Sequence, residues 1–135
     1  KHRAERRGFA DAMMLDWEGR VAECTGANIF FIKDGKIHTP TADCFLDGIT
    51  RRTVMDLARR RGFELIERRI MPEELSGFAE CFITGTAAEV TPIRELDRLE
   101  LGCGSRGPIT EKIQSAFFDI VNGRNPQYAH WLTKV

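Results

Sequence analysis

The chain is 135 residues long, and its twenty basic and twenty acidic side chains give a formal net charge of zero at neutral pH. This length fits one domain that can bury a real core, and the balanced charge argues against nucleic acid or an anionic membrane as a partner. The apolar runs are too short to cross a membrane and the N-terminus lacks the apolar core of a signal peptide, so we expect a soluble, cytoplasmic protein.

Four cysteines and three histidines are scattered along the chain. No two cysteines form a CxxC pair, so the spacing indicates neither a zinc site nor a disulfide framework, and no metal is expected. We expect reduced and mostly buried thiols at Cys24, Cys44, Cys81 and Cys103.

Residues 1–7 have helical character and end at Gly8, but no N-cap or preceding apolar turn starts such a helix. One interpretation is that the chain begins within an element and is the latter part of a larger protein. The other interpretation is a frayed basic terminus.

Strand patterns come next and predict two hairpins, with strands at residues 12–16, 20–24, 28–33 and 36–39. Asp34-Gly35, between the last two strands, is typical of a type I′ hairpin turn. Gly26 interrupts the strand pattern, which indicates a bend or a close approach of the backbone to another group. Glu23 therefore lies close in sequence to a position where the backbone bends or approaches another group.

The clearest helix signal lies at residues 50–61. Thr50 is a good N-cap, and apolar residues then recur at helical spacing until Gly62 ends the segment. Arg51 and Arg52 oppose the helix dipole in the first turn, so free N–H groups, a hydroxyl and two cations gather where a phosphate would fit. The alternative is an ordinary capped helix with solvated arginines.

The later elements alternate between strands and helices, which favours an α/β or mixed α+β class over an all-β one. Small residues at 84–89 leave room for a ligand to touch the backbone, and a tight turn chosen for packing is the alternative. The predicted elements are strands at 63–70, 80–83 and 90–96, a short helix at 71–77, a turn-rich segment at 94–107, a helix at 108–122 and a short helix or tail near 128–132. The helix at 108–122 has one apolar stripe, made of Ile109, Ile113, Phe117, Ile120 and Val121.

Three stretches, taken together in this order and spacing, resemble the class IV fold of pyridoxal-phosphate aminotransferases, and within it the branched-chain amino acid aminotransferases. They are residues 21–30 (VAECTGANIF), 46–51 (LDGITR) and 84–92 (TGTAAEVTP). The resemblance implies a mixed α+β fold, the C-terminal large domain of the D-amino acid aminotransferase-like type, with a pseudo-barrel sheet and flanking helices. It covers nearly the whole chain, so residues 1–135 are expected to form a single cofactor-binding domain.

The resemblance also implies pyridoxal 5′-phosphate as the cofactor. Glu23 matches the acid that faces the pyridine nitrogen and keeps it protonated. Ile49 and Thr50 match the positions that hold the phosphate through backbone N–H groups and a hydroxyl, and Leu46 matches a side chain that packs on the ring.

Substrate recognition is implied at a second stretch. Thr86 matches a further phosphate contact, and the backbone of Thr86 and Ala87 matches the donors that receive the substrate carboxylate. The implied substrates are an amino acid and a 2-oxo acid, and family members form homo-oligomers. Asp47 stands where the family commonly has proline, which alters the stiffness of the turn and removes no ligand.

The lysine that forms a Schiff base with the cofactor in this family, and the small N-terminal domain, have no match in this sequence. No lysine stands in the matching context, whether Lys1, Lys33, Lys36, Lys112 or Lys134. The resemblance therefore implies no catalytic residue in these 135 residues, and we expect the chain alone to be inactive.

The function implied by the resemblance is transfer of an amino group between leucine, isoleucine or valine and 2-oxoglutarate. D-amino acid transamination and an aminodeoxychorismate lyase are alternatives within the family, although the stretch at 84–89 and the long tail favour the branched-chain type. An alternative of a different class is a non-catalytic fragment or anion-binding module.

Overall fold

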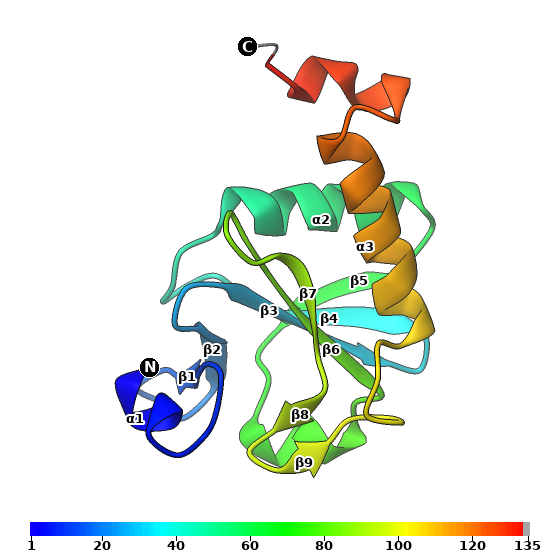
Figure 1. Cartoon of the computed structure of the whole chain (residues 1–135). Helices are drawn as coiled ribbons and strands as arrows, with labels where there is room; N and C mark the ends of the chain where they lie inside the picture. Colours follow the sequence, from blue (N-terminus) through cyan, green and yellow to red (C-terminus); the bar gives the residue numbers. More distant parts are fainter. Residues whose placement is uncertain (134–135) are drawn as a thin grey trace.

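The computed structural model describes residues 1–133, and a five-stranded mixed sheet lies at its centre (Figure 1). The strand order is β5-β4-β3-β6-β7. All neighbours are antiparallel except β4 and β5, which are parallel because the chain crosses between them through helix α2. The strands and the crossover helix are β3 (Asn28–Lys33), β4 (Lys36–Pro40), α2 (Ile49–Arg60), β5 (Leu65–Arg68), β6 (Glu80–Gly85) and β7 (Glu89–Ile93). The expected mixed α+β fold with flanking helices is confirmed.

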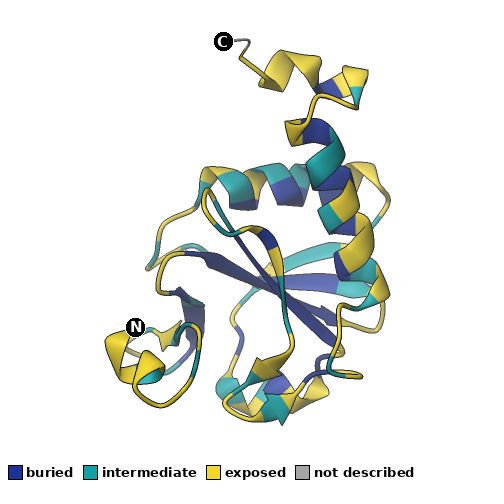
Figure 2. Cartoon of the chain, in the orientation of Figure 1, coloured by how far each residue is buried: buried dark blue, intermediate teal, exposed yellow. Residues whose placement is uncertain are grey.

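One face of the sheet is covered by α2 and α3 (Pro108–Val121), and Figure 2 shows the inner sides of these helices buried against the strands. Phe30 of β3 and Phe82 of β6 stack beneath them with ring centroids 4.9 Å apart. The predicted apolar stripe of α3 is confirmed except at Val121, which is 42% exposed. Each helical residue is rotated by about 100°, so a residue that directly follows the buried Ile120 turns away from the sheet.

The opposite face carries a second apolar cluster, which includes Ile29, Phe31, Cys81 and Ile83 of the central strands. The hairpin of β1 (Met13–Leu15) and β2 (Val21–Cys24) forms as predicted. The remaining elements are α1 (His2–Glu5), η1 (Pro72–Gly77), β8 (Glu95–Leu96), β9 (Leu99–Glu100) and η2 (Pro126–Trp131), of which η1 and η2 are 3₁₀ helices. Among residues 1–133, none of the helices combines the length and the apolarity needed to cross a membrane.

Of the two tight hairpins, the sequence predicts one turn and misses the other. Asp34 and Gly35 have φ angles of 51° and 74°, so the predicted type I′ turn between β3 and β4 is confirmed. The hairpin of β8 and β9 turns at Asp97 and Arg98, which also have positive φ angles of 45° and 68°. The sequence predicts only a turn-rich segment here, because a type I′ turn without glycine carries a weak signal.

The cysteines are divided between core and loops. Cys24 and Cys81 are buried, but Cys44 and Cys103 lie in loops and are exposed, so the expectation of mostly buried thiols is wrong for those two. Burial raises the pKa of the Cys24 thiol to about 12 and that of Cys81 well above its ordinary value. A hydrogen bond with Ser105, 2.9 Å away, lowers the pKa of Cys103.

We expect iodoacetamide to alkylate Cys103 in the folded chain and to leave Cys24 unmodified. The thiolate is the nucleophile, and a pKa of about 12 reduces its fraction roughly a thousandfold relative to a free cysteine. Mass spectrometry of the alkylated peptides checks the order, with urea-unfolded chain as the control in which both thiols react. Equal labelling of Cys24 and Cys103 before unfolding would contradict the assignment.

Candidate functional site

The N-terminus of α2 presents backbone N–H groups that no side chain of residues 1–133 caps. The helix begins at Ile49 and its N-cap is Gly48, an extended residue with φ −63° and ψ 148°. Thr50 therefore lies in the first turn, and its prediction as the N-cap is wrong, because the extended residue that precedes the helix falls two positions earlier. The first turn contains no acidic residue, so its free donors and the positive end of the helix dipole suit an anion.

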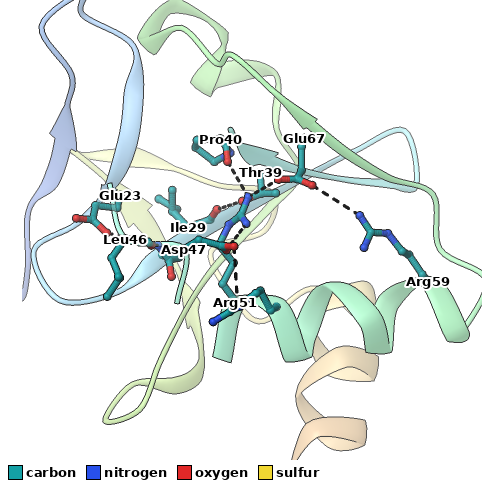
Figure 3. A network of polar contacts seen from close by, with 11 residues as sticks. Glu23, Ile29, Thr39, Pro40, Leu46, Asp47, Arg51, Arg59 and Glu67 are labelled. Carbon is teal, nitrogen blue, oxygen red and sulfur yellow. Dashed lines mark hydrogen bonds and ion pairs between the residues drawn. The ribbon is translucent and has the colours of Figure 1, made fainter. Parts of the chain in front are cut away.

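Arg51 does not offer its charge to that anion site. Its side chain is buried, and its guanidinium donates to Asp47 at 2.7 Å, to the Pro40 carbonyl at 2.9 Å and to Glu67 at 2.9 Å (Figure 3). The prediction that both Arg51 and Arg52 gather there as cations is thus wrong for Arg51, whereas Arg52 is exposed.

The reason lies in the helical period. Arg51 precedes Val54, Met55 and Ala58 by three, four and seven positions, and all four residues are buried on the same side of α2. The spacing was present in the sequence, but an arginine at an inward position can be buried only where partners meet it. Those partners are on other elements.

Asn28, at the start of β3, links β2 to the loop before α2. Its side-chain amide donates to the Leu46 carbonyl at 2.8 Å and to a Glu23 carboxylate oxygen at 3.4 Å. Glu23 is half-buried, and this burial raises the pKa of its carboxyl group. The carboxylate and the loop that leads to the helix N-terminus therefore share one amide. Sequence reasoning missed Asn28, although a polar residue at the head of an apolar strand was a visible signal.

Two glycines allow the chain to pack closely here. A Cβ on Gly48 would lie 2.5 Å from the Asn28 side-chain oxygen, so glycine is required at this approach. A Cβ on Gly85 would lie 3.1 Å from the Gly26 carbonyl. The prediction of a bend with close backbone approach at Gly26 is confirmed, since this turn between β2 and β3 lies against the end of β6.

The turn after β6 reaches the same end of the sheet. Thr84 is the register partner of Asn28, and its buried hydroxyl has no hydrogen-bond partner among the described residues. Thr86 and Ala87 follow in the turn between β6 and β7, and both are exposed. The structure thus brings three predicted stretches to one end of the sheet: β2 with its following turn, the loop that leads into α2, and the turn after β6.

Two large apolar side chains remain uncovered beside the helix N-terminus. Leu46 and Ile49 are each 77% exposed. The site residues predicted from sequence therefore include a half-buried acid, two exposed apolar side chains and main chain at Thr50, Thr86 and Ala87, none of which is fully buried by packing within residues 1–133.

Comparison with known proteins gives consistent matches. The family model for amino-transferase class IV matches residues 1–96. The branched-chain-amino-acid aminotransferase of Pseudomonas aeruginosa is 55% identical over 128 residues, which cover 95% of this chain and 42% of that protein. The chain therefore spans less than half the length of this relative.

Solved structures are similar over the same extent. The branched-chain aminotransferase of the thermophilic archaeon Thermoproteus uzoniensis, solved with norvaline, is 45% identical with a TM-score of 0.93, over 98% of this chain and 44% of that one. The branched-chain amino acid aminotransferase of Thermobaculum terrenum, in its PLP form, is 41% identical with a TM-score of 0.94, over 98% of this chain and 44% of that one.

Proposed function

The chain belongs to the class IV aminotransferase family, and on this basis we propose that it supplies part of the active site of a pyridoxal-phosphate-dependent branched-chain amino acid aminotransferase. The proposed reaction exchanges an amino group between leucine, isoleucine or valine and 2-oxoglutarate. The names of the similar proteins support this activity. Because the chain spans 42% of the Pseudomonas aeruginosa relative, the proposal concerns the share of the site that these residues contribute.

One observation carries the proposal: the Asn28 side-chain amide donates both to the Glu23 carboxylate and to the Leu46 carbonyl, which lies in the loop that leads to the uncapped N-terminus of α2. Pyridoxal phosphate has a phosphate at one end and a basic ring nitrogen at the other. A cluster of free N–H groups fits the first, and a carboxylate fits the second. The residues present therefore fit this cofactor.

Each side chain of the proposed site has a distinct role. The N–H groups of Ile49 and Thr50, with the Thr50 hydroxyl, bind the phosphate, and Leu46 packs against the ring. Glu23 holds a proton at the ring nitrogen, and because burial raises the pKa of its carboxyl group, pairing with a cationic N–H relieves an unfavourable charge. The bound cofactor supplies an electron sink, which the protonated nitrogen strengthens.

The turn between β6 and β7 is proposed to meet the substrate. Thr86 adds a phosphate contact, and the N–H groups of Thr86 and Ala87 receive the substrate carboxylate. Neither residue is buried, and their small side chains allow a ligand to approach the main chain closely. Recognition here depends on backbone donors, which bind any α-carboxylate without reading the side chain of the amino acid.

Three of the described lysines have neighbours outside the proposed cofactor and substrate site. Lys1 pairs with Glu5, Lys36 pairs with Glu64, and the Lys33 ammonium lies near Gly77. Lys134 lies outside the described residues. We propose that residues 1–133 bind and orient the cofactor and do not supply the amine that attaches it.

Self-association and a cytoplasmic location are also proposed. The β1–β2 hairpin exposes Met14, Leu15 and Trp17, and Trp17 is 78% exposed. Contiguous apolar side chains on a protein surface favour contact with another protein surface. These residues support a homo-oligomer, which sedimentation analysis over a range of concentrations tests.

Thr50→Ala is expected to weaken binding of pyridoxamine 5′-phosphate to the chain. The substitution removes one hydroxyl hydrogen bond to a charged group, which contributes about 1.5 to 3 kcal/mol. Isothermal titration calorimetry measures the change, and pyridoxamine without phosphate serves as the second ligand. The difference between the two ligands should shrink in the variant.

Thr53→Ala is the matched control, because Thr53 lies about one turn further along α2 and outside the first turn. It should bind pyridoxamine 5′-phosphate as the unaltered chain does. Equal weakening by both substitutions, or no phosphate dependence in the unaltered chain, would overturn the proposed phosphate site.

A further inference from the structure

We propose that Arg51 is a positioning residue that keeps the Asp47 carboxylate off the N–H groups at the start of α2. This inference rests on the proposed function, since it concerns how the anion site at Ile49 and Thr50 stays free. It assigns to the buried arginine an indirect role, carried out through the side chain it holds.

Asp47 is placed to compete with any anionic ligand. It directly precedes the N-cap Gly48 and lies two residues before Ile49. An aspartate readily accepts a hydrogen bond from the backbone N–H two residues further along, in an Asx turn. That donor is the Ile49 N–H, so a released Asp47 carboxylate would occupy the same group that the phosphate needs.

In the structure the carboxylate turns toward Arg51 instead. One oxygen accepts from the Arg51 guanidinium at 2.7 Å (Figure 3). The other oxygen lies 3.9 Å from the Arg52 side chain. No side chain among residues 1–133 accepts from the N-terminal N–H groups of α2 as a cap. The Asp47 carboxylate, which could compete with an anionic ligand, is therefore held away from these N–H groups by Arg51.

Arg51 can hold it because its own position is fixed from two strands. The Pro40 carbonyl at the end of β4 and the Glu67 carboxylate on β5 each accept from the guanidinium at 2.9 Å. Glu67 is further paired with Arg59 at 3.7 Å (Figure 3). The planar guanidinium satisfies three acceptors at fixed directions, whereas a lysine ammonium is a point charge that cannot hold the same three in place.

The charge balance favours this role over direct attraction. Two carboxylates face the buried guanidinium, so little of its positive charge is left for a ligand. Removing Arg51 should therefore act on a ligand mainly by releasing Asp47. Adding a substitution at Asp47 tests whether Arg51 acts through this carboxylate or by attracting the ligand directly.

The first experiment measures binding of pyridoxamine 5′-phosphate by calorimetry to four forms of the chain. Arg51→Gln should weaken binding about tenfold, because capping by an internal carboxylate competes with the ligand for the same donors. Adding Asp47→Ala to Arg51→Gln should restore affinity to within about threefold of the unaltered chain. Asp47→Ala alone should bind at least as tightly as the unaltered chain.

The second measurement needs no ligand. In Arg51→Gln the Ile49 amide should exchange its proton more slowly and shift downfield in its nitrogen–proton spectrum, and both changes should vanish in the double variant. Arg52→Gln is the matched control, since it removes an equal charge one residue along and leaves Asp47 held by Arg51. Its Ile49 amide should stay as in the unaltered chain.

Failure of the two ideas can be told apart. If the unaltered chain shows no phosphate-dependent binding, the proposed function fails, while the Ile49 amide still decides the role of Arg51. If Arg51→Gln weakens binding and Asp47→Ala does not rescue it, or if the amide is unchanged, the inference is overturned. Should Arg51→Gln not fold by circular dichroism, Arg51→Lys with and without Asp47→Ala provides the same comparison.

Discussion

Replacing Gly48 by alanine is expected to weaken binding of pyridoxamine 5′-phosphate about tenfold or more. The backbone angles of Gly48 suit alanine, so the effect comes from contact alone. The added Cβ would lie 2.5 Å from the Asn28 side-chain oxygen and must displace that amide. Asn28 then loses its bonds to Leu46 and Glu23, and a buried polar group without its partner costs about 1 to 3 kcal/mol.

This substitution tests the proposed site as a unit, because both ends of the cofactor depend on the displaced side chain. Gly77→Ala is the matched control, since only the flexible end of Lys33 lies within 4 Å of its added Cβ. Calorimetry with the phosphate and phosphate-free ligands should show a loss for both ligands in Gly48→Ala and for neither in Gly77→Ala. An unchanged affinity in Gly48→Ala would show that Asn28 does not organise the site.

The second large effect is expected on stability, from Glu80→Ala. The buried Glu80 carboxylate of β6 caps α3, accepting from the Ile109 N–H at 3.2 Å and from the Thr110 N–H at 2.7 Å. Alanine leaves both donors without an acceptor inside the fold, and we expect the free energy of unfolding to fall by about 2 to 4 kcal/mol. Urea unfolding followed by circular dichroism measures it.

Two further variants define the cause. Glu80→Gln keeps one acceptor oxygen and should lose less stability than Glu80→Ala. Glu111→Ala removes an exposed acid from the first turn of the same helix, where its surface pair with Arg106 contributes at most about 1 kcal/mol. Equal losses in Glu80→Ala and Glu111→Ala would contradict the capping role.

Gly107 offers an independent check on the same contact. A Cβ there would overlap the Cγ and Cδ atoms of Glu80, so Gly107→Ala should destabilise the chain by forcing this carboxylate away from α3. From sequence, Gly107 is expected only as part of a turn-rich segment. Its requirement for glycine comes from a side chain on a distant strand.

Family resemblance and local pattern together located the candidate site, but they did not describe its internal contacts. The order and spacing of the stretches at 21–30, 46–51 and 84–92 are enough to indicate the family. The folded chain adds that Thr50 is not the cap and that Arg51 turns inward. The binding roles of the predicted site residues stay predictions: Glu23, Leu46, Ile49, Thr50, Thr86 and Ala87. The experiments above test the phosphate site at Ile49 and Thr50, and they test Glu23 through Asn28.

The sequence alone determined what neighbouring residues decide among themselves. The hairpin at Asp34-Gly35 follows from residues that tolerate positive φ, and the helices follow from apolar residues that recur with the helical period. Tertiary structure decided which polar groups meet across the chain: Arg51 with Glu67 over 16 positions, and Glu80 with Thr110 over 30. Such partners are chosen by how strands and helices pack, because a buried charge or an uncapped N–H is satisfied by whichever group the folded backbone brings within reach.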